Sequence, residues 1–242
     1  MNTEANILSI ENLTTSYNGK PVLHELCLLL KKGEICCVIG EEGAGKSTLL
    51  KSITQQIKSK GEISYNGINV AKLTPNKMVR NGIDFIAQGG NILNGFTVEE
   101  HICLALSERS KTERSIVWKE IEQMFPNLIT LKKQIAGRLS GGERIILSIA
   151  CVLASDANFL VLDEPTAGLA PETCKVIGDF LLRMKNDRYK TIMLLEHNYD
   201  FAFGIADSVV TLKEGKLSAK YFSKDFKKLN FVDEKLYKTI TS

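Results

Sequence analysis

The fold of this chain is decided by residues 40–47, Gly40-Glu41-Glu42-Gly43-Ala44-Gly45-Lys46-Ser47. This stretch fits the phosphate-binding pattern G-x-x-x-x-G-K-[ST]. An apolar, β-rich run at 34–39 precedes it, and a helix-compatible pattern at 47–53 follows it. Glycines permit a tight loop whose backbone N–H groups converge on phosphate oxygens, and the helix start adds partial positive charge. Lys46 would reach the terminal phosphates and the Ser47 hydroxyl would ligate Mg²⁺, so the sequence predicts a nucleoside triphosphate site.

Composition is compatible with one large domain. The chain has 242 residues, 44% of them hydrophobic, and a formal net charge of +3, which gives no sign of a nucleic-acid partner. It contains no window of about eighteen uninterrupted apolar residues, and its first six residues lack the features of a signal peptide. Six cysteines without a C-x-x-C pair are expected to be buried thiols. These features predict a cytoplasmic protein.

Strands and helices are expected to alternate around the phosphate loop. The apolar patterns predict strands within 7–31 with a turn at 18–19, a hairpin at 61–70, and strands at 83–87, 159–162, 191–195 and 208–212. They predict helices at 99–106, 115–124, 143–153 and 172–184. This order indicates a parallel sheet with crossover helices and a helical insertion in the middle of the chain. The lysine-rich end, 213–242, is expected to form a solvated helical face rather than a membrane or nucleic-acid patch.

Two carboxylates end the strand predicted at 159–162. In a parallel nucleotide-binding sheet, ligands lie at the carboxyl ends of the strands. Asp163 is therefore expected to face the Mg²⁺ held by Ser47, and Glu164 to polarise an attacking water. Two solvated acids that merely close a strand are the alternative, and the neighbouring phosphate loop argues against it.

Two further motifs have both a functional and a structural interpretation. His197 follows the strand at 191–195, where it could contact the γ-phosphate and hold the attacking water, or could be a structural histidine. The turn at 139–143 opens a helix and forms a second anion-binding helix start, although a helix cap alone would explain Ser140. One nucleotide does not need two cradles in one chain, so the second cradle is expected to serve a partner's nucleotide.

In this order, the motifs resemble those of the ATPase subunit of ABC transporters along nearly the whole chain. The resemblance implies an α/β P-loop NTPase of ABC ATPase type, with a mainly parallel core, an antiparallel β subdomain and an inserted helical subdomain. It implies a single nucleotide-binding domain over 1–242. Within it, the core and β subdomain would occupy 1–88 and 155–220, the helical signature subdomain 89–154, and a short tail 221–242.

The resemblance also implies roles for individual residues. The catalytic residues would be Glu164, His197, Gln88 and Lys46, and Mg²⁺ would lie at Ser47, Gln88 and Asp163. ATP would contact Tyr17, stacked on adenine, and the run Gly40, Glu41, Glu42, Gly43, Ala44, Gly45, Lys46, Ser47 and Thr48. The signature residues Ser140, Gly141, Gly142 and Glu143 would contact the ATP of a second ATPase subunit, either a copy or a paralogue, in a head-to-tail dimer.

Transmembrane permease subunits are the other implied partners. They would dock near 97–100 and hold the chain on the cytoplasmic face of the membrane, so that membrane contact would come only through them. The stretches at 88–100, 124–128 and 163–171 are similar to those of branched-chain amino-acid importer ATPases. A urea or amide importer, an envelope-lipid exporter, or a soluble ABC ATPase acting as an assembly factor are the alternatives.

This chain departs from the family pattern at several positions. Glu41 and Glu42 place two carboxylates in the phosphate loop, which should weaken nucleotide binding unless they point to solvent. The segment 144–151 is more apolar than usual and lacks an arginine common there. Ala170 stands where many of these ATPases carry an aspartate, a feature that the amino-acid subgroup shares. Because Lys46, Ser47, Asp163, Glu164 and His197 are all present, we expect activity.

Overall fold

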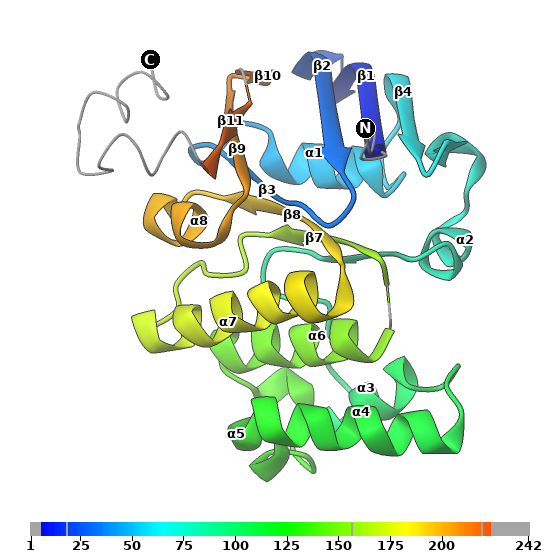
Figure 1. Ribbon diagram of the computed structural model, residues 1–242, viewed down its shortest axis with the longest axis vertical. Helices are drawn as coiled ribbons and strands as arrows, with labels where there is room; N and C mark the ends of the chain where they lie inside the picture. Colours follow the sequence, from blue (N-terminus) through cyan, green and yellow to red (C-terminus); the bar gives the residue numbers. More distant parts are fainter. Residues whose placement is uncertain (1–5, 18, 156, 219, 224–242) are drawn as a thin grey trace.

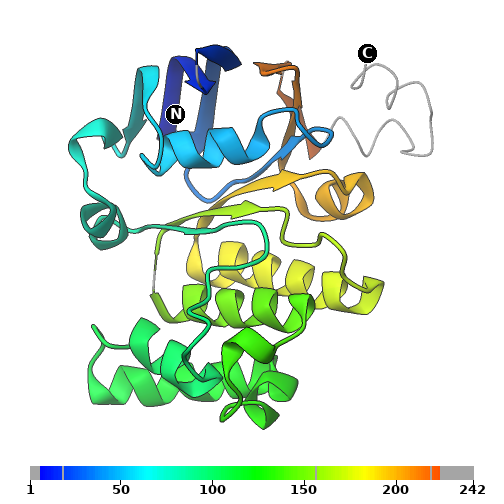
Figure 2. The same ribbon diagram turned by 180° about the vertical axis from the view of Figure 1, so that it is seen from behind.

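The computed structural model describes residues 6–223, apart from positions 18, 156 and 219. Its layers follow one another along the long axis of the molecule (Figure 1), and the view from behind shows the same order (Figure 2). One end is an antiparallel sheet in the order β2-β1-β4-β5, beside helix α1. Its strands are β1 (Asn6–Tyr17), β2 (Lys20–Lys31), β4 (Ser59–Tyr65) and β5 (Ile68–Asn69). The predicted strands and hairpin in this region are confirmed.

The central sheet has the order β10-β9-β3-β8-β7-β6, and β11 also pairs with β9. Strands β3, β6, β7, β8 and β9 run parallel, as predicted, whereas β10 and β11 pair antiparallel with β9. The bounds are β3 (Ile35–Ile39), β6 (Ile83–Ile86), β7 (Phe159–Asp163), β8 (Thr191–Glu196), β9 (Ser208–Lys213), β10 (Lys216–Leu217) and β11 (Tyr221–Phe222). Parallel pairing places the carboxyl ends of β3, β7 and β8 at one edge.

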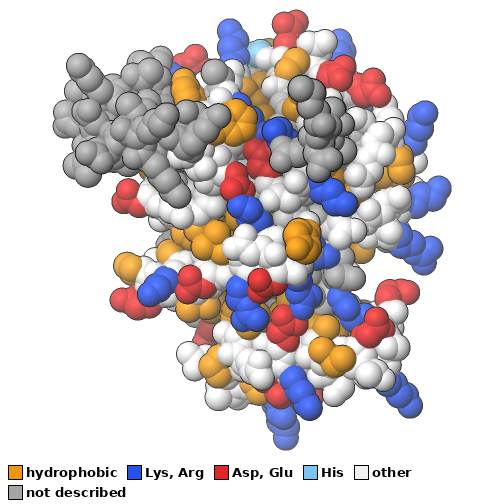
Figure 3. Space-filling model, in the orientation of Figure 1, with side chains coloured by type: hydrophobic (Ala, Val, Ile, Leu, Met, Phe, Trp, Pro, Cys, Tyr) orange, Lys and Arg blue, Asp and Glu red, His pale blue; other side chains and the backbone are white. Residues whose placement is uncertain are grey.

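Helices cover both faces of this sheet. Four of them, α3 to α6, lie between β6 and β7 in the sequence, the segment predicted as a helical insertion. The helices are α1 (Lys46–Ile53), α2 (Pro75–Arg80), α3 (Val98–Ala105), α4 (Lys111–Met124), α5 (Pro126–Thr130), α6 (Gly141–Ser155), α7 (Pro171–Arg188) and α8 (Tyr199–Ile205), with short 3₁₀ turns at Val70–Lys72 and Ala136–Arg138. Figure 3 shows that Lys, Arg, Asp and Glu side chains are interspersed over the helical end on the face it presents.

Two cores lie on the two faces of the parallel sheet, and β3 contributes to both. Cys36 and Val38 pack with the antiparallel sheet and α1. Ile35, Cys37 and Ile39 pack with the helices on the other face. All five residues of β3 are 0% exposed. This burial explains why the strand reads as an uninterrupted apolar run rather than an alternating one.

Two predictions about less regular parts of the chain are wrong. Residues 213–218 and 220–222 do not form a helical face, because Glu214 and Gly215 adopt positive φ and the chain turns from β9 into β10. The rest of that tail, 224–242, lies outside the described residues. The cysteines are not all buried: Cys27 is on the outward face of the alternating strand β2, and Cys103 is on an exposed side of α3.

Among the helices that the structure describes, none is both long enough and apolar enough to cross a bilayer.

Candidate functional site

The phosphate loop joins the end of β3 to the start of α1. Gly45, which precedes the helix, has φ 111°, and a Cβ there would lie 2.8 Å from Cδ2 of Leu23 on β2. A Cβ on Gly40 would lie 2.5 Å from the carbonyl oxygen of Leu212 on β9. The loop is therefore held closely between two sheets, and only glycine fits at these two positions.

Lys46 lies inside the loop. Its side chain is 4% exposed, and its Nζ donates hydrogen bonds to the carbonyl oxygens of Gly40, at 2.6 Å, and Glu41, at 2.8 Å. The same Nζ lies 3.0 Å from Oε1 of Glu164. This places a buried positive charge where the pattern predicts the terminal phosphates of a nucleotide.

Asp163 and Ser47 form the pair expected to hold a metal ion. Asp163 ends β7 with 1% exposure, and its Oδ1 has no hydrogen-bond partner among the residues that the structure describes. Burial raises the pKa of this carboxyl group, while a hydrogen bond with Ser47 acts to lower it. A carboxylate oxygen without a partner, next to a hydroxyl, is an oxygen donor set of the kind that Mg²⁺ prefers. These residues therefore fit the ion.

Glu164 occupies the centre of the site in a left-handed backbone conformation, with φ 49°. Its backbone N–H donates to the carbonyl oxygen of Leu195, 2.8 Å away, which ties this residue to β8. Nε2 of Gln88 donates to Oε2 of Glu164 at 2.8 Å, and Nδ1 of His197 lies 3.6 Å from Oε1. The structure thus brings together the predicted residues Lys46, Gln88, Glu164 and His197, although they come from four segments.

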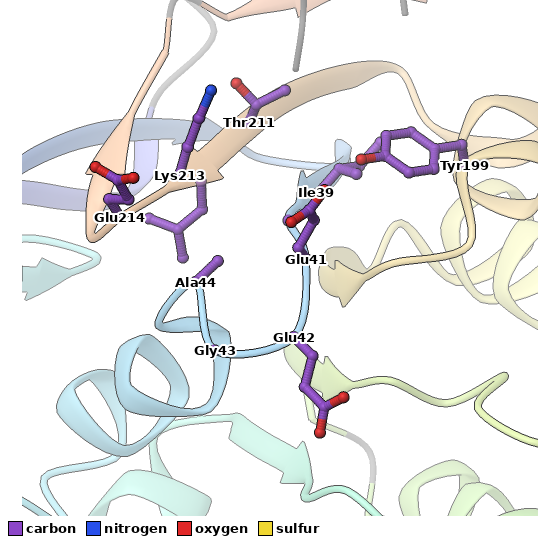
Figure 4. A pocket seen from close by; sticks show the side chains of 11 residues that line it. Ile39, Glu41, Glu42, Gly43, Ala44, Tyr199, Thr211, Lys213 and Glu214 are labelled. Atoms are coloured by element: carbon purple, nitrogen blue, oxygen red, sulfur yellow. The ribbon is translucent and has the colours of Figure 1, made fainter. Parts of the chain in front are cut away.

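A cavity of about 350 Å³ opens beside this cluster. It is lined by Gly40, Glu41, Glu42, Gln88, Glu164, His197 and Tyr199. A second cavity, of about 390 Å³, lies between the loop, α8 and the end of β9. In Figure 4 the side chain of Glu41 projects towards this second cavity, whereas Glu42 points away from it. Both carboxylates are exposed, which meets the condition under which they would least oppose phosphate binding.

Tyr17 lies at the edge of the site. It ends β1, is 40% exposed and lines neither cavity. It pairs with Lys20 across the β1–β2 hairpin, and Val22, two residues further along, has its carbonyl oxygen 3.6 Å from the Cβ position of Gly45. The hairpin that carries Tyr17 therefore contacts the phosphate loop, and its role as an adenine stacker remains a prediction.

The signature turn opens helix α6 away from the phosphate loop. Ser140 and Glu143 form a reciprocal capping box: the Ser140 N–H donates to Oε2 of Glu143 at 2.7 Å, and the Glu143 N–H donates to the Ser140 hydroxyl at 3.3 Å. Ser140 and Gly141 are exposed and line a separate cavity of about 390 Å³. Gly89, Glu164 and the loop 167–170 line the same cavity.

One residue of this site carries no role in the sequence analysis. This residue is Glu196, the last residue of β8, which is 0% exposed. It accepts hydrogen bonds from two loops, the one that follows Glu164 and the one that contains His197. The available signal was a carboxylate at the end of an apolar strand, directly before the predicted histidine. A single sequence does not reveal what such a side chain contacts.

Comparisons with known proteins agree with this geometry. The sequence profile of the family described as ABC transporter matches residues 23–167. The chain is 36% identical over 214 residues to a probable branched-chain amino acid transport ATP-binding protein LivF of Archaeoglobus fulgidus, covering 88% of this chain and 90% of the relative. It is 32% identical over 212 residues to the high-affinity branched-chain amino acid transport ATP-binding protein BraG of Pseudomonas aeruginosa, covering 87% and 91%.

Solved structures show the same fold. An ATP-binding subunit of an ABC transporter superposes with a TM-score of 0.85 at 25% identity, covering 98% of this chain and all of the other. A dimeric, post-hydrolysis ATP-binding cassette bound to ADP and Pi superposes with a TM-score of 0.80 at 25% identity, covering 89% and 98%. From the family match and these relatives, the chain belongs to the ABC transporter family, as an ATP-binding subunit that hydrolyses ATP.

Proposed function

We propose that this chain powers an importer of branched-chain or other hydrophobic amino acids. The names of the LivF and BraG relatives support this substrate class, and the chain covers 90% and 91% of their lengths. A methionine import and a carnitine transport ATP-binding protein also match, but the chain covers only 64% and 54% of the lengths of these two relatives. The agreement in length as well as in sequence favours the amino-acid group.

Hydrolysis at this site would proceed by attack of water on the γ-phosphorus, with the bond to the bridging oxygen of ADP breaking. The carboxylate of Glu164 would accept the proton of that water, and His197 would hold the water in line. Gln88 fixes the orientation of the Glu164 carboxylate through its 2.8 Å hydrogen bond. Lys46 would neutralise charge on the terminal phosphates. The convergence of Lys46, Gln88 and His197 on Glu164 is the observation that carries the proposal.

Ser47, Asp163 and Gln88 would hold Mg²⁺. The unpartnered Oδ1 of Asp163 supports this assignment. When bound, the ion would supply further neutralisation of phosphate charge. The protein's own part is to keep the carboxylate oxygen and the hydroxyl at a fixed place beside the loop.

A second ATPase subunit would complete the site. The Ser140–Glu143 turn faces a different cavity from the one lined by the phosphate loop. Its capping box does not use the N–H groups of Gly141 and Gly142, which would serve a nucleotide held by a partner. The similarity to a dimeric cassette supports this arrangement. Permease subunits would hold the pair at the cytoplasmic face of the membrane.

The role of Glu164 is tested with Glu164→Gln. We expect ATP binding to persist and turnover to fall by about 10²- to 10³-fold, because the amide cannot accept the proton. ATP affinity and steady-state turnover of the purified protein measure this. Glu172→Gln, an exposed change in the first turn of α7, is the matched control and should leave turnover unchanged. Turnover near the wild-type rate in Glu164→Gln would remove Glu164 as the general base.

The substrate class is tested with the membrane subunits that co-purify with this chain. Reconstituted in liposomes with their binding protein, the complex should couple ATP hydrolysis to uptake of leucine, isoleucine or valine. Methionine, carnitine and urea serve as comparison substrates. Uptake of one of these in preference to the branched-chain amino acids would overturn the assignment. Failure to find any polytopic partner would instead favour a soluble assembly factor.

A further inference from the structure

We infer that Glu196 is a positioning residue for the ATPase reaction, holding the loop of Glu164 and the loop of His197 at a fixed separation. This inference rests on the proposed roles of Glu164 and His197. Glu196 itself does not line either cavity beside the phosphate loop. It acts through the two loops that do present catalytic groups.

The carboxylate of Glu196 divides its two oxygens between the two loops. Oε1 accepts hydrogen bonds from the backbone N–H of Thr166, at 3.1 Å, and from the Thr166 hydroxyl, at 2.7 Å. Oε2 accepts from the backbone N–H groups of His197, at 3.1 Å, and Asn198, at 3.2 Å. The side chain is 0% exposed. The buried carboxylate thus accepts hydrogen bonds from four neutral donors, two at each oxygen, and none of these donors is a cation.

Each loop places a catalytic side chain one or two residues away. Thr166 follows Glu164 by two residues, and the N–H of Ala167 donates to the Glu164 carbonyl oxygen at 3.2 Å, which closes a tight turn. His197 receives its contact through its own backbone N–H. The 3.6 Å separation of the His197 ring from the Glu164 carboxylate therefore depends on the bridge that Glu196 makes.

The same bridge reaches the signature cavity. The N–H of Leu169 donates to the carbonyl oxygen of Thr166 at 3.2 Å, and Cδ2 of Leu169 lies 3.2 Å from the Cβ position of Gly142. Glu196 thus ties the general base to the loop that packs beside the turn proposed to serve the partner's nucleotide. A displacement of Thr166 would disturb both halves of the shared site.

The arrangement requires a carboxylate. A glutamine at this position could accept hydrogen bonds at its single oxygen, but its NH₂ group would face the donors of one loop. One loop would lose its acceptor and shift, and misplacement by about 1 Å can cost about 10²-fold in rate. At position 166, Thr166→Val removes the hydroxyl donor without changing the shape of the side chain, whereas Thr166→Ser retains the hydroxyl.

The test uses Glu196→Gln, Thr166→Val and Thr166→Ser in the purified protein. For Glu196→Gln we expect kcat to fall about ten- to hundredfold while KM for ATP changes by less than about threefold, because the phosphate loop keeps its own contacts. Thr166→Val should lose about fivefold in kcat and Thr166→Ser less than about twofold. Hydrogen exchange should quicken at residues 166–170 and 197–199 together, with helix α1 as the unchanged reference.

Several results would overturn the inference. Wild-type kcat in folded Glu196→Gln would do so, as would exchange that quickens in only one loop, or equal kcat values for the valine and serine variants. If Glu196→Gln does not fold, the comparison of Thr166→Val with Thr166→Ser decides the matter alone. Glu164→Gln run in parallel keeps the two hypotheses apart, because turnover retained in that variant would contradict the proposed function, whereas the exchange experiment still reports on Glu196.

Discussion

The phosphate loop and the signature turn are two helix starts that are built in different ways. The loop before α1 is closed: Lys46 is 4% exposed and bonded to the loop carbonyls and to Glu164. The turn before α6 is open: Ser140 and Gly141 are exposed, and the N–H and hydroxyl of Ser140 bond to Glu143, one turn along the same helix. Both starts present backbone N–H groups suited to an anion.

This difference separates what the chain assembles by itself from what it offers to another molecule. Lys46, Gln88 and His197, which come from three other segments, converge on Glu164 within one chain. On the signature side, a capping box holds Ser140, and Leu169 packs beside Gly142. An exposed cap is a sufficient explanation of Ser140 taken alone, and experiments must therefore distinguish a cap from a ligand-binding turn.

The largest effect is expected from Lys46→Ala. Removal of the buried ammonium leaves the carbonyls of Gly40 and Glu41 without their donor and removes the charge that would meet the terminal phosphates. We expect nucleotide binding to be lost, as measured with a fluorescent ATP analogue. Retained micromolar affinity would contradict the phosphate-loop assignment and with it the contrast between the two helix starts.

A smaller loss is expected from Ser140→Arg, because nucleotide binding to the phosphate loop should persist. Cooperative turnover should fall by about 10²-fold and nucleotide-driven pairing should disappear, since a large cation would fill the turn offered to the partner. Turnover against ATP concentration and light scattering with and without nucleotide measure these effects.

A second capping box supplies the control for Ser140. Ser110 and Glu113, at the start of α4, repeat its hydrogen bonds at nearly the same lengths. Ser110→Arg should lower stability by about 1 kcal/mol, as loss of the cap does elsewhere, and leave turnover unchanged. Equal losses of turnover in both variants would show that Ser140 is only a helix cap.

Weaker effects are expected from the carboxylates in the phosphate loop. Glu42→Gln should tighten ATP binding by about two- to fivefold at low salt, because removing an exposed negative charge near phosphate gains only modest Coulomb energy. Glu41→Gln should change affinity less, since its side chain projects towards the cavity beside β9 (Figure 4). The gain should shrink as salt rises. Equal affinity in all three proteins would mean that neither carboxylate approaches the nucleotide.

The last comparison concerns thiol reactivity, between the buried strand before the loop and exposed positions on β2 and α3. Burial raises the pKa of Cys36 to about 11, so at pH 9 only about 1% would be thiolate, whereas a pKa of 9.0 would give half. Cys27 and Cys103 are exposed and should alkylate first. Mass spectrometry of peptides after brief alkylation checks the order. Early reaction at Cys36 would show that β3 opens readily.

Much of the phosphate side could be predicted because its signals are local. A glycine-rich loop between a buried strand and a helix defines both a conformation and a ligand, and parallel pairing then brings Asp163 to the same edge. The assignment of the Ser140 turn to a partner's nucleotide rests on the number of cradles that one nucleotide needs, and it stays a prediction. These arguments rest on spacing and topology, which a sequence expresses directly.

Other features depend on contacts that a sequence does not express. The four donors around Glu196 come from residues 30 positions earlier and from the next loop, so nothing beside Glu196 announces them. The turn at Glu214 and Gly215 competes with a helical charge pattern and prevails because β10 completes a pair with β9. Cys27 is exposed because it lies on the outward face of β2. Its apolar neighbours in the sequence give no sign of that orientation.

Strand β3 has a consequence for how this protein tolerates change. Its five residues divide between the hydrophobic layers above and below, and the nucleotide loop begins where the strand ends. A methyl group deleted from either layer leaves a cavity against the same strand, at a cost of about 1 kcal/mol. Packing changes in either layer therefore act on the strand that carries the nucleotide loop, and we expect them to alter ATP affinity together with thermal stability.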